Sequence, residues 1–65
     1  MRKTTEILDK HLRIDVYHQG NLWYFHIIHI PTGISVKSKV GHKSYIQGRK
    51  VVIEEFRKRM KNEYN

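Results

Sequence analysis

The sequence predicts an α+β domain: a three-stranded antiparallel sheet packed by a C-terminal helix, with a short N-terminal helix, in the order α-β-β-β-α. Three observations support this fold class. Apolar and polar residues alternate from residue 12 onward, Pro31-Thr32-Gly33 is typical of a tight turn, and the C-terminal third repeats apolar residues at helical spacing. Residues 1–65 are expected to form a single small basic domain, frayed at 1–4 and 62–65.

The first predicted element is a short helix near residues 5–11. Thr4 and Thr5 are acceptable N-caps, and Ile7, Leu8 and Leu12 fall close to one face at helical spacing.

The sheet is predicted to begin at Leu12, where the period changes to two. Leu12, Ile14 and Val16 point to one side and Arg13, Asp15 and Tyr17 to the other, as in a half-buried strand. Residues 18–21 supply a turn.

Residues 22–30 are dense in aromatic and β-branched side chains, which favours a central strand. Either face of this strand could receive the helix. We expect Trp23, Phe25 and Ile27 to form the core, because burying Trp and Phe removes the larger apolar area from water. Tyr24 then faces outward.

The Pro31-Thr32-Gly33 turn leads to a third predicted strand over residues 34–40, with lysines on its open side.

Ser44 and Gln47 fit a capping box that starts a helix of four to five turns. Gly48 destabilises a helix interior by about 1 kcal/mol relative to Ala. Two alternatives are open: the helix begins after Gly48, or another group approaches the backbone there.

Charge and composition favour a binding protein over an enzyme. The net charge is +7, and it is concentrated between residues 37 and 61, as expected of a surface that meets phosphates. The chain has no cysteine, its histidines lack metal-ligand spacing, and no hydroxyl is paired with a base, so we expect no metal, no cofactor and no catalytic residue. The absence of cysteine, of a signal-peptide core and of a long apolar run predicts a cytoplasmic protein without a membrane partner.

The predicted nucleic-acid contacts combine the basic residues of the second half with two outward tyrosines. They are Lys37, Lys39, Lys43, Ser44, Arg49, Lys50, Arg57, Tyr17 and Tyr24.

Three segments are similar to the catalytic domain of class I peptide-chain release factors, a family that includes ribosome-rescue peptidyl-tRNA hydrolases. Ile14 to Tyr17 resembles its first strand, Ile28 to Val36 its central hairpin, and Lys43-Ser44-Tyr45 followed by Gly48-Arg49 the start of its last helix. The catalytic Gly-Gly-Gln loop of that family is missing, and only residues 18–21 occupy the interval. The resemblance therefore implies binding of structured RNA or the ribosome through Lys43, Ser44 and Arg49, without hydrolase activity.

Other partners are left open. Double-stranded-RNA-binding domains share the predicted α-β-β-β-α order. Arm-binding domains of integrases place a three-stranded sheet in the DNA major groove, which would give Arg13, Tyr17, Tyr24, Lys37 and Lys39 the role of reading DNA. A small phage-type protein inhibitor that docks on an acidic host protein is a third possibility. The sequence sets no oligomeric state, and an exposed sheet edge could pair with a second copy.

Overall fold

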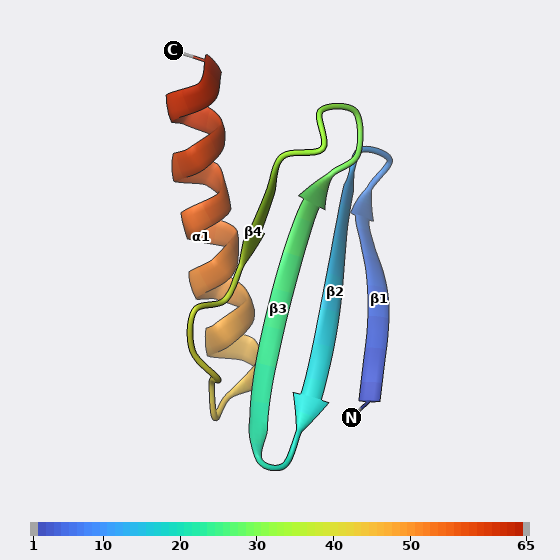
Figure 1. Ribbon diagram of the computed structural model, residues 1–65, viewed down its shortest axis with the longest axis vertical. Coiled ribbons are helices and arrows are strands. Elements are labelled where there is room, and N and C mark those ends of the chain that lie inside the picture. The colour runs from blue at the N-terminus through green and yellow to red at the C-terminus, as the bar shows by residue number, and fades with distance from the viewer. Residues whose placement is uncertain (1, 65) are drawn as a thin grey trace.

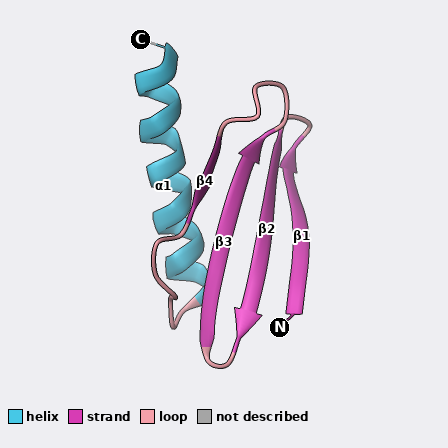
Figure 2. Cartoon of the chain, viewed as in Figure 1, coloured by secondary structure: helices cyan, strands magenta, loops and turns pink. Residues whose placement is uncertain are grey.

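The computed structural model describes residues 2–64 and contains four strands followed by one helix (Figure 1). The strands β1 (Arg2–Asp9), β2 (Leu12–Gln19), β3 (Leu22–His29) and β4 (Ser35–Lys37) form an antiparallel meander in the order β1-β2-β3-β4. The helix α1 (Tyr45–Tyr64) contacts β3 and β4 and leaves the β1 side of the sheet without a helix over it (Figures 1 and 2). The α+β class is confirmed, but the predicted three-stranded sheet is wrong, because the sheet has four strands.

The N-terminal helix predicted over residues 5–11 is wrong, because this segment belongs to β1. Glu6 pairs with Ile14 of β2, and Thr5 pairs with Asp15. Leu8 packs against the core and Ile7 is 66% exposed, as the alternation of a strand requires, and the register then shifts at a β-bulge between Ile7 and Asp9. Pairing with the exposed edge of β2 satisfies a full row of backbone groups, and this outweighs a weak local helix pattern.

The two turns of the central hairpins use glycine where the backbone needs a positive φ. Gly20 has a φ of 62° in the two-residue turn between β2 and β3. Gly33 has a φ of 75°, and its N–H donates to the carbonyl of His29 over 2.8 Å. The Pro31-Thr32-Gly33 corner is therefore confirmed as the connection between β3 and β4.

The core lies between α1 and the face of the sheet predicted to be apolar. Phe25 and Ile27 are each 1% exposed, and Trp23 packs against them from the same side of β3. This confirms the predicted choice of face. The buried apolar residues are Ile14, Val16, Phe25, Ile27, Val52 and Phe56.

The third predicted strand is shorter than residues 34–40, since β4 ends at Lys37. Ser38 ends the ladder because its Oγ accepts a hydrogen bond from the Phe25 N–H over 2.7 Å and so replaces a backbone partner. Val40, which alternation over residues 34–40 would place opposite the lysines on the core side, is 62% exposed. The chain rejoins the edge of β3 only at His42, which pairs with Trp23.

The helix begins before Gly48, and Ser44 caps it by accepting the Gln47 N–H over 3.3 Å. A Cβ atom at Gly48 would lie 2.6 Å from Phe25 Cε1 and 2.8 Å from His42 Cβ. Of the two alternatives for Gly48, close approach to the backbone is the one realised.

The segments predicted to fray, 1–4 and 62–65, lie mostly within secondary structure. Residues 2–4 are part of β1, and residues 62–64 continue α1. Met1 and Asn65 fall outside the described residues, and fraying stays a prediction.

Candidate nucleic-acid interface

The face of the sheet opposite α1 carries polar and aromatic side chains that no helix covers, and we call it the open face. Alternate residues of a strand share one face, so the register aligns its side chains in three rows across the strands. The rows are Lys3-Tyr17-Tyr24, then Thr5-Asp15-His26-Lys37, then Ile7-Arg13-Ile28-Ser35. A shallow hollow of about 510 Å³ lies over this face, lined by Arg13, Asp15, Tyr17, Tyr24, Phe25, His26, Ile28, Lys37 and Ser38.

Tyr17 and Tyr24 are directly opposite each other on the two central strands, and both are half-buried. The Lys3 ammonium lies 5.9 Å from the centroid of the Tyr17 ring, within cation–π range. Gly41 approaches the other tyrosine so closely that a Cβ there would lie 2.9 Å from Tyr24 Cζ. The tyrosine pair is thus held between a cation and the loop that follows β4.

Asp15 is the one acid among the three rows, and it is buried at 3% exposure. Its Oδ1 accepts a hydrogen bond from the Thr5 hydroxyl over 3.0 Å and lies 3.5 Å from Arg13 Nε, while Oδ2 lies 3.9 Å from Lys3 Nζ. The negative charge is therefore screened, and Lys3, Arg13 and Lys37 dominate the field above the open face.

His26 stands between Asp15 and Lys37 in the middle row. Burial lowers the pKa of His26 below its ordinary value of 6.5, and the charge of Lys37 lowers it further. Its Nε2 is buried and has no hydrogen-bond partner among residues 2–64. At neutral pH the imidazole is uncharged and can accept or donate a hydrogen bond.

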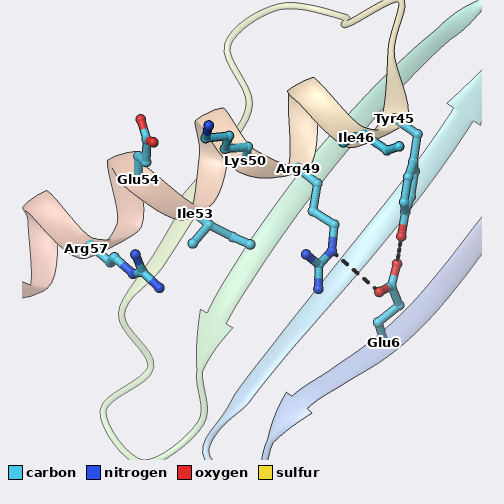
Figure 3. A pocket seen from close by; sticks show the side chains of 8 residues that line it. All are labelled: Glu6, Tyr45, Ile46, Arg49, Lys50, Ile53, Glu54 and Arg57. Carbon is cyan, nitrogen blue, oxygen red and sulfur yellow. Dashed lines mark hydrogen bonds and ion pairs between the residues drawn. The ribbon is translucent and has the colours of Figure 1, made fainter.

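A second hollow, of about 500 Å³, lies on the other side of the sheet between α1 and β1 (Figure 3). The Tyr45 hydroxyl donates to a Glu6 carboxylate oxygen, and Arg49 Nε lies 3.6 Å from the other oxygen. The hydrogen bond to Glu6 raises the pKa of Tyr45 above its ordinary value of 10.0, and burial adds to this. These contacts fasten the start of the helix to the outer strand.

The nine predicted contact residues do not form one surface. Tyr17, Tyr24 and Lys37 share the open face, whereas Arg49, Lys50 and Arg57 line the hollow beside the helix. Lys39, Lys43 and Ser44 lie in the connection between β4 and α1. These basic residues follow one another closely in the sequence, which hid their division, because only packing decides which side of the sheet the helix covers.

Sequence reasoning missed Lys3, Asp15 and His26 as members of the site. Lys3 was missed because its neighbours were interpreted as the start of a helix. The alternation of Lys3, Thr5 and Ile7 with Thr4, Glu6 and Leu8 is the signal that could have placed it in a strand.

No protein-family model, curated protein or solved structure matches this chain. The resemblance to release factors therefore stays a prediction. Within residues 2–64, no helix is long and apolar enough to cross a membrane, and no cluster of three or more potential ligands could hold a metal ion.

Proposed function

We propose that this chain is a non-enzymatic DNA-binding module that contacts duplex DNA with its open face. One observation carries the proposal: an uncovered sheet face presents Lys3, Arg13 and Lys37 in three successive rows, together with the tyrosine pair of its two central strands. Cations supply most of the affinity for a phosphate backbone, and side chains that stand up from a sheet can reach base edges.

The dimensions of the sheet favour duplex DNA. Neighbouring strands lie about 4.8 Å apart, so β1 and β4 are separated by about 14 Å. The major groove of B-DNA is about 12 Å wide and admits two strands, so β2 and β3 would face the groove while β1 and β4 would lie over the two phosphate backbones. The deep, narrow major groove of A-form RNA does not admit side chains in this way.

Binding of structured RNA or the ribosome has less support from the structure than it had from the sequence alone. That expectation relied on Lys43, Ser44 and Arg49 as phosphate contacts. Ser44 caps the helix, and Arg49 lies with Glu6 in the hollow beside the helix, so neither belongs to the open face. The N-terminal helix shared with double-stranded-RNA-binding domains is replaced by β1.

The test compares binding of labelled duplex DNA, duplex RNA and single-stranded DNA by fluorescence anisotropy over a range of salt concentrations. Duplex DNA should bind most tightly, and affinity should fall steeply as salt rises. Lys37→Ala should weaken binding of all sequences and reduce the salt slope by about 1. Lys58→Ala is the matched control, because this exposed lysine belongs to the helix, on the other side of the sheet.

The proposal fails if none of these nucleic acids binds, or if duplex RNA binds more tightly than duplex DNA. It also fails if Lys58→Ala weakens binding as much as Lys37→Ala does. Capture of one acidic protein, unaffected by nuclease, would favour the inhibitor alternative instead.

A further inference from the structure

Asp15 is a buried carboxylate on a face that is otherwise open and basic. Its side chain is 5% exposed, whereas the neighbouring side chains of Lys3 and Arg13 are 55% and 43% exposed. A carboxylate at this depth cannot touch a ligand that rests on the cations above it. Its contacts with Thr5, Lys3 and Arg13 are all internal, so its effect on a ligand acts through the groups that it holds.

Arg13 is held by the inner end of its guanidinium. Its Nε is buried and forms an ion pair with Asp15 Oδ1 at 3.5 Å, without a hydrogen bond to any of residues 2–64. The ion pair limits where the guanidinium can lie and leaves its two terminal nitrogens as the donors available to a ligand. A restrained planar fork can form a bidentate contact with lower loss of conformational freedom than a free side chain.

The location of Arg13 distinguishes it from the other cations of the open face. It stands on a central strand, with Ile7 beside it on β1 and Ile28 beside it on β3. Lys3 and Lys37 instead stand on the two outermost strands. When such a face enters a groove, the outer strands meet the phosphate backbones and the central strands meet the base edges.

We infer that Arg13 reads a guanine in the major groove and that Asp15 is the residue that positions it, an inference that rests on the proposed DNA-binding function. Guanine presents the O6 and N7 acceptors side by side, which matches two parallel donors of a guanidinium. A good contact of this kind discriminates against other bases by about 5- to 150-fold. Lys3 and Lys37 would contribute affinity without sequence preference.

The experiment selects bound sequences from a pool of duplex DNA with a randomised central segment. The pool selected by the unaltered protein should contain a strongly preferred guanine at one position. Arg13→Lys keeps the charge but lacks the fork, so it should lose this preference while the salt slope of binding stays the same. Lys37→Ala should keep the preference and bind every sequence more weakly. Arg57→Ala, on the helix, is the matched arginine control and should change neither property.

Asp15→Asn tests the positioning role. The amide keeps the shape and removes the charge, so the guanine preference should fall by more than the affinity for the average sequence. A circular dichroism melt identifies any loss of fold, and Arg13→Lys tests the same inference without altering the buried carboxylate. If Arg13→Lys retains the preference, or if the unaltered protein binds duplex DNA with no preferred base, the inference is overturned and the proposed function stands. If no duplex DNA binds, both are overturned.

Discussion

The hydroxyl of Tyr45, at the first residue of α1, donates a hydrogen bond to the carboxylate of Glu6 in β1, 39 residues earlier in the chain. Arg49, one turn further along the helix, contacts the same carboxylate. Because α1 packs on β3 and β4, this cluster is a direct link between the helix and the outermost strand. Glu6 therefore connects the N-terminal strand to the C-terminal helix.

Tyr45→Phe should destabilise the protein by about 1.5–3 kcal/mol, because the ring is retained while a hydrogen bond to a charged group is lost. The ring itself packs edge-on against Trp23, with the centroids 5.2 Å apart. Urea unfolding measures the change. Tyr24→Phe is the control, since the Tyr24 hydroxyl has no hydrogen bond within residues 2–64, and an equal loss in both variants would contradict the assigned role of Glu6.

The same phenol sets a dependence on alkaline pH. The pKa of Tyr45 is raised in the folded state, so the folded protein holds this proton more tightly than the unfolded chain does. The stability that Tyr45 contributes is present below its ordinary pKa of 10.0 and is lost as pH rises through the higher folded value. Tyr45→Phe should lose less stability than the unaltered protein between neutral and strongly alkaline pH. If the two proteins gave parallel curves of stability against pH, ionisation of Tyr45 would not contribute.

Gly48→Ala should destabilise the protein, although alanine is normally the better helix former. The added methyl group would meet Phe25 and His42 at distances that require the core to move. Overpacking of this kind costs about 1–3 kcal/mol, more than the gain of about 1 kcal/mol in helix propensity. Gln47→Ala, at the exposed neighbouring position, should be nearly neutral. A Gly48→Ala variant with a raised melting temperature would disprove the close approach.

His26 should make stability fall in mildly acidic solution. Its pKa is lowered in the folded state, so below its ordinary pKa of 6.5 the unfolded chain binds the proton more readily and unfolding is favoured. Lys37, Arg13 and Lys3 repel the added charge, while Asp15 attracts it. Unfolding of the His26→Gln variant between pH 7.5 and pH 5 should therefore show a smaller loss of stability than the unaltered protein. A larger loss of stability in His26→Gln than in the unaltered protein would mean that attraction by Asp15 outweighs burial and the repulsion from the three cations.

Arg49→Ala should affect folding more than binding. Its guanidinium is paired with Glu6 on the side of the sheet away from the open face, so its removal should cost at most about 1 kcal/mol of stability. The salt slope of DNA binding should not change, in contrast to Lys37→Ala. If Arg49→Ala and Lys37→Ala reduced the salt slope of DNA binding equally, Arg49 would be a phosphate contact.

The protein should not hydrolyse peptidyl-tRNA on ribosomes. The sequence contains no Gly-Gly-Gln segment, and the interval where the family that it resembles carries that loop holds a two-residue turn at Gly20. Release of labelled peptide above background, at a rate unaffected by Gln19→Ala, would contradict the inference that loss of the loop removes the chemistry.

Much of this fold is encoded in short local patterns. Gly20 and Gly33 mark turns because a positive φ is easily adopted only by glycine, and the alternation from Leu12 to Tyr17 identifies a half-buried strand without further information. The choice of the Phe25 face as core also follows from the sequence, since burying the larger aromatic area is favoured. Ser44 marks the beginning of the helix for a similarly local reason.

Only the tertiary structure decided the state of residues 2–9 and the composition of the candidate site. Ile7 and Leu8 fit either a helix or a bulged strand, and the free edge of β2 selected the strand by offering backbone partners. The basic residues after Lys37 are adjacent in the chain, but α1 lies on the face of the sheet opposite Tyr17 and Tyr24, which separates Arg49 from Lys37 and brings Lys3 into the group instead. Hydrophobic period and turn chemistry are properties of neighbouring residues, whereas a shared surface depends on strand register and on the side that the helix covers.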